Sequence, residues 1–408
     1  MSDSIQILRS LELFAGAGGL AIGLHHAGFK PRALVEFNRH ACETLRFNAD
    51  NGFETLNGAK LFAGDVREVD FAEIDAVDVV TGGPPCQPFS IGGKHKGRQD
   101  ERDMFPQAVR AVRTLKPKAF IFENVKGLLR ESFTEYFEFV VLQLSYPTIL
   151  RRVGEDWRDH LSRLERHHTK AGEAGELAYR VVFRLLNAAD YGVPQFRERV
   201  FIVGFRHDLG IEWSFPKPTH SYDALVKAKW VTGDYWEQHK IAKKHRPKIP
   251  DTLKKQVQFL SSEFDMFNMH ERMRTVRDAL VGLPEPQLKP EGYGVGLTNH
   301  ELRLKARSYP GHTGSPIDEP SKALKAGGHG VPGGENMILF NDGTVRYFTT
   351  REAARIQRFP DNYHICGSWT EGMRQVGNAV PVELAHVVGA SVRKQLLKNG
   401  RSQQKGAF

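Results

Sequence analysis

A cysteine in a proline-rich loop is the first group in this sequence that could do chemistry. Cys86 lies in the run GGPPCQPFS at 82–90, directly after the short apolar run at 78–81. Glycines supply turn geometry and prolines stiffen a loop, and the end of a buried strand is where α/β enzymes place reactive groups. A lone cysteine is usually a small buried apolar residue. A loop stiffened by prolines and glycines is not needed to pack a buried apolar residue, so we predict that Cys86 is a nucleophile.

A glycine-rich turn, FAGAGG at 14–19, provides the second chemical feature. Glycines between a strand and a helix let a ligand approach the backbone at the helix N-terminus. Glu36 ends the next predicted strand, where a carboxylate can accept both hydroxyls of a ribose, and Asp65 could bind an adenine amino group. A tight structural turn with two surface acids is the alternative, but the spacing favours a nucleoside site. Such a site fits NAD, FAD or S-adenosylmethionine. The predicted contacts are Phe14, Ala15, Gly16, Gly18, Gly19, Leu20, Glu36, Phe37, Asp65, Val66 and Pro85.

These residues need a sheet to position them. The pattern predicts strands at 5–15, 33–37, 78–81, 119–122 and 199–205, with helices at 20–27, before Gly28, and at 38–48. This alternation indicates a doubly wound α/β sheet. From 215 to 346 the chain is rich in Pro, Gly, His and Lys and shows no such alternation, which predicts a second, smaller and irregular domain. A helix opened by Pro381 is expected to pack back on the first domain, so we predict domains at 1–214 plus 347–408 and at 215–346.

The composition narrows the class of protein. The 408 residues carry a net charge of +9 and a pI of about 9.3, which makes an acidic partner such as nucleic acid plausible. Cys42, Cys86 and Cys366 form no C-x-x-C pair and the histidines lack ligand spacing, so we expect neither disulfides nor a metal. The sequence shows no signal peptide and no apolar run of about 18 residues. A cytoplasmic enzyme or binding protein is expected.

Six motifs in a fixed order resemble the C5-cytosine-specific DNA methyltransferase family, of the bacterial restriction-modification or orphan type. They are FAGAGG at 14–19, PPCQPFS at 84–90, ENV at 123–125, QFRER at 195–199, REAARIQ at 351–357 followed by FPD, and QVGNAVP at 375–381. The resemblance covers 8–205 and 346 to about 390. It implies a doubly wound, S-adenosylmethionine-dependent methyltransferase sheet with a separate target-recognition domain.

The chemistry of cytosine explains why the catalytic residues are needed. C5 is a poor nucleophile, and attack at C6 by the Cys86 thiolate turns the ring into an enamine that can accept a methyl group. The resemblance assigns Glu123 to protonate N3. Arg197 could steady the cytosine O2 and the thiolate, and Arg199 is expected to pair with Glu123. From the residues alone, Glu123 could equally cap a helix or form a salt bridge, and the arginines could lie on the surface.

The resemblance also implies that Asn378, with Ala379, closes over the methionine part of the cofactor. C6 is inaccessible to a thiol inside a stacked duplex, so the target base is expected to be flipped out.

The middle region is basic, and charge runs of this kind are usually solvated faces. Its position inside a nucleic-acid enzyme favours contact with phosphates. The basic stretch comprises Lys227, Lys229, Trp230, Lys243, Lys244, His245, Arg246, Lys248, Lys254 and Lys255. The glycine- and histidine-rich run at 303–334 is expected to approach a groove. The predicted DNA contacts are Ser90, Gln195, Arg303, His312, Lys325 and His329.

Three other functions remain open at this stage. A methyltransferase of the same mechanism could act on tRNA, although the size of the basic region favours double-stranded DNA. A catalytically idle DNA-binding protein is disfavoured because every expected catalytic residue is present, and a dehydrogenase because the G-x-G-x-x-G register is absent. The charged stretch at 151–178 has helix-like spacing and looks like an insertion, either a surface helix or a further DNA contact. We expect a monomer, with a restriction endonuclease as a candidate partner.

Overall fold

A computed structural model of the chain describes residues 7–85, 103–170, 175–262, 270–288, 297–326 and 334–405. Cys86, Ser90 and His329 therefore lie outside the described residues. The chain folds into two compact units, which are considered separately. The first contains Met1–Leu186, Glu198–Pro216 and Ala385–Phe408, and the second contains Asn187–Arg197 and Lys217–Leu384.

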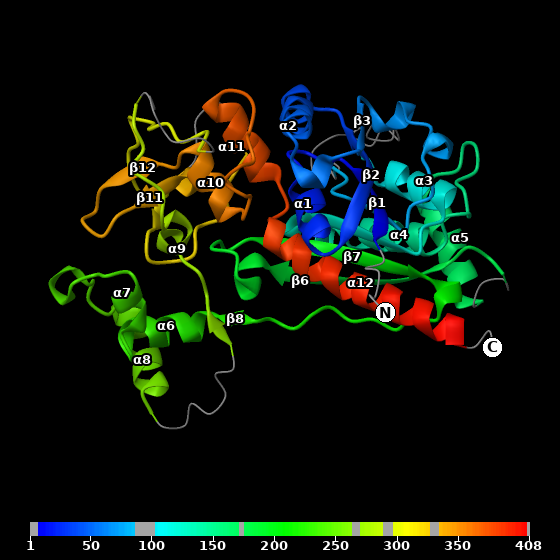
Figure 1. Ribbon diagram of the computed structural model, residues 1–408. Coiled ribbons are helices and arrows are strands. Elements are labelled where there is room, and N and C mark those ends of the chain that lie inside the picture. The colour runs from blue at the N-terminus through cyan, green and yellow to red at the C-terminus, as the bar shows by residue number, and fades with distance from the viewer. Residues whose placement is uncertain are drawn as a thin grey trace. The chain divides into compact units, whose positions relative to one another are not determined.

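The first unit is built on a seven-stranded sheet in the order β3-β2-β1-β4-β5-β7-β6 (Figure 1). The strands are β1 Leu8–Leu13, β2 Phe29–Glu36, β3 Lys60–Ala63, β4 Val79–Gly82, β5 Ala119–Val125, β6 Tyr179–Asn187 and β7 Glu198–Arg206. The first five strands pair in parallel, whereas β7 runs antiparallel to β5. The predicted doubly wound α/β sheet is confirmed, with one antiparallel strand that the short apolar run at 199–205 did not reveal.

The helices of this unit are α1 Gly19–His26, α2 Arg39–Asp50, α3 Phe105–Leu115, α4 Thr134–Ser145, α5 Trp157–Thr169 and most of α12 Val382–Lys405. Local signals place their ends. The Asn38 side chain accepts a hydrogen bond from the amide of Ala41 and caps α2, and Gly28 after α1 has a φ of 91°. In the charged stretch at 151–178, Asp156 caps α5.

Helix α12 packs on the first unit, as predicted. A Cβ added at Gly389 would lie 2.6 Å from the side chain of Leu24 in α1, so the two helices approach closely there. The indole of Trp213 also donates to the hydroxyl of Ser391 at 2.9 Å.

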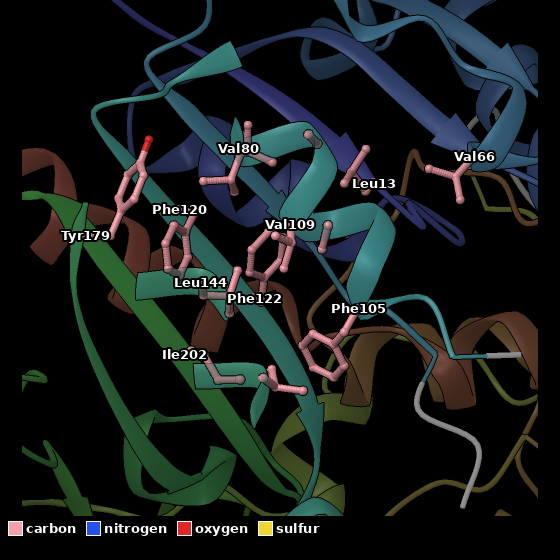
Figure 2. Close-up of a cluster of buried hydrophobic side chains, with 14 of the residues drawn as sticks. Leu13, Val66, Val80, Phe105, Val109, Phe120, Phe122, Leu144, Tyr179 and Ile202 are labelled. Carbon is pink, nitrogen blue, oxygen red and sulfur yellow. The ribbon is translucent and has the colours of Figure 1, made fainter. Parts of the chain in front are cut away.

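Aromatic side chains of β5 form the centre of the core (Figure 2). Phe120 and Phe122 are fully buried with ring centroids 5.2 Å apart, and Tyr179 lies 5.3 Å from Phe120. Gly204 of β7 pairs with Phe120, and a Cβ there would come within 2.2 Å of the Phe120 ring. Only glycine leaves room for this ring, so β5 and β7 pack closely against each other at this position.

The second unit contains short elements. They are β8 His220–Ser221, α6 Tyr222–Trp230, α7 Asp234–Gln238, α8 Lys254–Leu260, β9 Glu271–Arg272, α9 Val276–Leu280, β10 Ser315–Pro316, β11 Met337–Leu339, β12 Val345–Tyr347, α10 Thr350–Ile356 and α11 Trp369–Asn378. Its interior is partly polar: the buried Tyr235 hydroxyl donates to Asp318 at 2.7 Å, and Arg277 pairs with the same carboxylate. Burial would raise the pKa of Asp318, but Arg277 and Asn341 outweigh it and the pKa is lowered.

The second unit is larger than the irregular domain predicted at 215–346. It takes in α10 and α11, because α10 packs against both α9 and α11, and also the segment Asn187–Arg197. The division into catalytic and target-recognition domains is functional rather than geometric, and it stays a prediction. Among the described residues, no helix is long and apolar enough to cross a membrane.

Candidate active site

Glu123 lies at the carboxyl end of β5 and is paired with Arg199. The nitrogen Nε of Arg199 lies 2.7 Å from Oε1 of Glu123, and both side chains are largely buried. The pair forms because β7 runs antiparallel to β5 and brings Arg199 opposite Val125, two residues along from Glu123. The ion pair expected between these residues is present. An ion pair this far from solvent fixes the orientation of the carboxylate.

The same strand end holds the loop that leads to Cys86. A Cβ added at Gly83 would lie 3.2 Å from Oε2 of Glu123, and the side-chain amide of Asn124 donates to the carbonyl of Pro84 at 2.9 Å. The exposed Pro85 accepts from the amide of Met104 at 3.2 Å. The final described residues before Cys86 are thus fixed next to Glu123, although Cys86 itself is not described.

The glycine turn leaves open space beside the backbone. Phe14, Gly16 and Gly18 have φ values of 56°, 55° and 81°, and the amide of Gly18 donates to the carbonyl of Ala15 at 2.9 Å. A Cβ at Gly16 would meet no atom of the described residues within 4 Å. The other predicted contacts of the turn, Gly19 and Leu20, are buried in the start of α1. A helix N-terminus beside an open turn is suited to a polar ligand.

Glu36 connects this turn to the next strand end. Its two carboxylate oxygens accept hydrogen bonds from the amides of Gly16, at 2.7 Å, and Asn38, at 2.6 Å. Each oxygen keeps a further lone pair, which could accept a ribose hydroxyl. The neighbouring Phe37 has 77% of its surface exposed, which leaves an aromatic face available to a planar base.

Asp65 and Val66 lie after β3 in the same unit. The Arg67 side chain and backbone hydrogen-bond to the Asp65 carboxylate, which lowers its pKa, while Val66 is buried. An ionised acceptor in this position fits the amino group of an adenine. Glu36 and Asp65 together offer the hydrogen-bond acceptors that an adenosine-containing cofactor requires, and Phe37 offers an aromatic face.

Glu12 is a residue that the sequence analysis missed. It is only 2% exposed in β1, and burial, followed by the charge of Glu36, raises its pKa well above the usual value. Its Oε2 atom has no hydrogen-bond partner within the described part of the chain. An acid inside the apolar run LELFA was the available signal.

Two predicted site residues have a different environment from the one expected. Gln195 is completely buried, its Oε1 accepts from the amide of Leu324 at 3.0 Å, and its amide donates to Gln357. It has no side-chain atom to offer to DNA, so that prediction is corrected. Arg197 is 1% exposed, and its guanidinium donates to backbone carbonyls of the second unit rather than lying open to a base.

Asn378 and Ala379 lie at the end of α11. Asn378 is exposed at the last position of the helix, whereas Ala379 is buried. Both belong to the second unit, and their contact with the cofactor stays a prediction.

The basic region divides into buried and exposed residues. Lys229 is buried and its ammonium lies 2.6 Å from Glu319, so the prediction that it contacts phosphates is corrected. Trp230 packs against the small core around Trp236. The exposed members and one further exposed lysine nearby, Lys240, are here called the basic surface, which comprises Lys240, Lys243, Lys244, His245, Lys248, Lys254 and Lys255. They lie from just after α7 to the start of α8, and the one acid in the sequence of this segment, Asp251, pairs with Lys254.

The remaining predicted DNA contacts lie on loops of the second unit. Lys325 is exposed and pairs with Glu335 at 2.6 Å, and Arg303 lies 3.5 Å from Glu301. His312 stacks on Tyr309 with ring centroids 4.4 Å apart. Across the described ranges, no group of His, Cys, Asp or Glu could hold a metal ion.

This chain is similar to known proteins over nearly its whole length. The family model of the C-5 cytosine-specific DNA methylases matches residues 8–146 and 160–394. The type II methyltransferase M.PspPI of Psychrobacter sp. (strain TA137) is 31% identical over 95% of this chain and 79% of that protein. The type II methyltransferase M.NgoMIV of Neisseria gonorrhoeae is 29% identical over 95% of this chain and 98% of that protein.

Solved structures agree on the fold. A putative DNA modification methyltransferase encoded within a prophage (E. coli) aligns with a TM-score of 0.58 at 21% identity, covering 95% of this chain and 99% of that one. The S. pombe Dnmt2 methyltransferase aligns with a TM-score of 0.54 at 16% identity, with coverages of 95% and 99%. The sheet, the ordered motifs and the family match lead to one conclusion: the chain belongs to the C-5 cytosine-specific DNA methylase family and is a DNA (cytosine-5-)-methyltransferase.

Proposed function

We propose that this methyltransferase acts on a cytosine flipped out of duplex DNA, through a covalent bond between Cys86 Sγ and C6, with S-adenosylmethionine as methyl donor. One observation carries the proposal: the carboxylate of Glu123 is fixed by Arg199 against Gly83, three residues before Cys86. This arrangement supports a thiol and an oriented carboxyl group acting on the same ring.

Each residue has a distinct task in this reaction. Attack by the Cys86 thiolate at C6 forms the Sγ–C6 bond and pushes the ring electrons toward N3, where Glu123 supplies a proton. C5 then has the electron density to take a methyl group. Loss of the C5 proton to a base and departure of the thiolate restore the aromatic ring. Arg199 holds the carboxyl group of Glu123 in place throughout, because its guanidinium can orient a carboxylate in a fixed direction.

The first unit supplies the residues that would hold the cofactor. When bound, S-adenosylmethionine supplies an activated methyl group on a sulfonium. Glu36, fixed by two backbone amides, would accept from the ribose hydroxyls, and Asp65 would accept from the adenine amino group. The exposed Phe37 would lie against the adenine face, and the open turn at Gly16 would admit the rest of the ligand. We further assign Asn378 to the methionine end.

The basic surface supports double-stranded DNA as the substrate. Seven exposed cationic or titratable side chains within 16 residues suit a row of phosphates better than a small molecule. Flipping of the target base follows from the chemistry, because C6 of a stacked base is shielded by its neighbours and a side chain cannot reach it.

The test is a transfer assay with S-adenosylmethionine carrying a labelled methyl group, using duplex DNA or tRNA. We expect label as 5-methylcytosine in DNA with the wild-type protein and none with Cys86→Ser. A duplex with 5-fluorocytosine at the mapped site should trap a denaturant-stable complex, because fluorine cannot leave as the proton does. Transfer to tRNA alone would overturn the substrate, and transfer without a trapped complex would overturn the covalent mechanism.

Two further proposals concern partners. The type II names of the relatives support a companion endonuclease that reads the same sequence, which mapping of the methylated site followed by digestion with the neighbouring gene's product would test. A single flipped base needs one active site, so we propose a monomer. Sedimentation with and without duplex DNA would reveal a dimer if one forms.

A further inference from the structure

A buried arginine in the second unit joins two segments that are distant in sequence. The Nη1 atom of Arg197 donates to the carbonyl of Leu324 at 3.2 Å, and Nη2 donates to the carbonyls of Gly377 at 2.7 Å and Ala379 at 3.0 Å. Gly377 and Ala379 flank Asn378 at the end of α11. Leu324 directly precedes Lys325.

Two glutamines reinforce the same junction. Gln195 accepts from the amide of Leu324 and donates to Oε1 of Gln357 at 3.2 Å. The amide of Gln357 then donates to the carbonyls of Val376 at 2.8 Å and Ala379 at 3.2 Å. The side chains of Gln195, Gln357 and Arg197 are almost completely buried, so water does not substitute for these hydrogen bonds.

The two segments also touch directly. A Cβ added at Gly377 would lie 2.7 Å from the backbone nitrogen of Ala326, a distance that side chains do not show. On the other side, the buried Asn336 accepts from the amide of Lys325 at 3.1 Å and donates to its carbonyl at 3.0 Å. The backbone amides and carbonyls of Leu324 and Lys325 are therefore all hydrogen-bonded. Their partners are the buried side chains of Gln195, Arg197 and Asn336.

The arginine side chain suits this position for a physical reason. The last carbonyls of a helix have no partner within the helix and carry partial negative charge, which a cation at that end stabilises. A planar guanidinium can serve several carbonyls in fixed directions, whereas a lysine ammonium is a single point charge on a flexible stem. Arg197 thus fixes the end of α11 and the segment at 324–326 relative to each other.

We propose that Arg197 is a positioning residue that couples Asn378, at the cofactor, to Lys325, at the DNA, so that binding of one ligand changes the affinity for the other. The inference rests on the proposed function for the role of Asn378 and on the predicted DNA contact of Lys325, and it replaces a direct contact of Arg197 with the cytosine. Coupling between two binding sites is reciprocal, so the cofactor must change DNA affinity by the same factor by which DNA changes cofactor affinity.

The experiment compares Arg197→Lys with the wild-type enzyme, using S-adenosylhomocysteine and a duplex with the mapped site. Titrations of each ligand, alone and with the other present, give the coupling factor. We expect wild-type coupling of at least about fivefold. In Arg197→Lys the coupling factor should fall toward one. The KM for both substrates should rise about tenfold, as expected for loss of a charged hydrogen bond, while kcat at saturation is retained. A large fall in kcat with unchanged KM values and coupling would overturn the inference in favour of direct contact with the base.

Arg351→Lys is the matched control. Arg351 is, among the described residues, the other fully buried arginine of this unit, and it also donates to backbone carbonyls, those of Thr298, Pro360 and Tyr363. It should cost comparable stability and leave the coupling factor unchanged. An equal loss of coupling in Arg351→Lys would reduce the Arg197 effect to general destabilisation and overturn the inference.

A second variant and a ligand-free readout separate this inference from the proposed function. Gly377→Ala should push the two segments apart with Arg197 intact and give the same loss of coupling. Hydrogen exchange should show faster exchange of the Leu324 and Lys325 amides in Arg197→Lys than in Arg351→Lys. If the wild-type enzyme proved unable to methylate DNA, the proposed function would fail. Unchanged exchange at these amides in Arg197→Lys would instead overturn the inference that Arg197 fixes the segment at 324–326.

Discussion

Neutralising part of the basic surface should weaken DNA binding in a way that depends on salt. In the triple variant Lys243→Gln, Lys244→Gln and Lys248→Gln, three exposed cations are removed from the segment between α7 and α8. Each phosphate contact releases counterions and contributes about 0.9 to the slope of log affinity against log salt concentration. Three contacts therefore predict a slope shallower by about 2.7. Between 50 and 200 mM salt, wild-type affinity should fall about 40-fold more than that of the variant.

Fluorescence anisotropy with a labelled duplex, at five or more salt concentrations, measures this slope directly. The charge-matched control is Arg9→Gln, Lys30→Gln and Lys60→Gln, three exposed residues of the first unit outside the charged stretch at 151–178. It lowers the net charge equally, so a similar change in slope would mean that total charge, and not this surface, governs binding. An unchanged slope in the first variant would refute the assignment of the basic surface to phosphates. In either variant kcat at saturating DNA should be retained.

Three further predictions concern the first unit. Glu123→Gln should lower kcat by about 10²- to 10⁴-fold with unchanged duplex affinity; a variant as active as the wild type would remove Glu123 from the chemistry. The pKa of Glu12 is raised in the folded protein, so its protonated form favours folding most below the usual value of 4.5, and this contribution declines as pH rises toward the raised value. Urea titrations should therefore show Glu12→Gln gaining stability relative to the wild type by up to about 1.4 kcal/mol per pH unit between pH 4.5 and the raised pKa, and a pH-independent difference would contradict the burial argument. Gly204→Ala should cost about 1–3 kcal/mol of unfolding free energy, because its methyl group would overlap the Phe120 ring; a neutral effect in calorimetry would mean that the ring can move.

The sequence predicted those features that depend on neighbouring residues. The strand, glycine turn and helix from 8 to 26 follow from local pattern, and so does the cap at Asn38. The placement of Glu123 and Arg199 came from family motifs, which encode the outcome of folding, and the ion pair between them is present.

Residues whose partners are distant in sequence could not be predicted in the same way. Arg197 and its carbonyl partners are separated by 127 to 182 positions, so no local pattern distinguishes a buried clamp from an open catalytic cation. Lys229 lies in a basic run and looked like its neighbours, but Glu319, 90 positions away, neutralises it in the interior. A buried charge is recognisable only when its counter-charge is known, and the fold supplies that information.

The two compact units exchange the chain four times, at 186/187, 197/198, 216/217 and 384/385. The second unit therefore consists of two separate segments of the sequence, and recombination could not replace it as one contiguous segment. A chimaera that imported 217–384 from a relative with another sequence specificity would keep Asn187–Arg197 of the host. Gln195 and Arg197 of the host would then have to pack inside the imported part of the second unit. Exchange of the second unit as a whole should therefore require the segment Asn187–Arg197 to be exchanged with it, or to be identical in both parents.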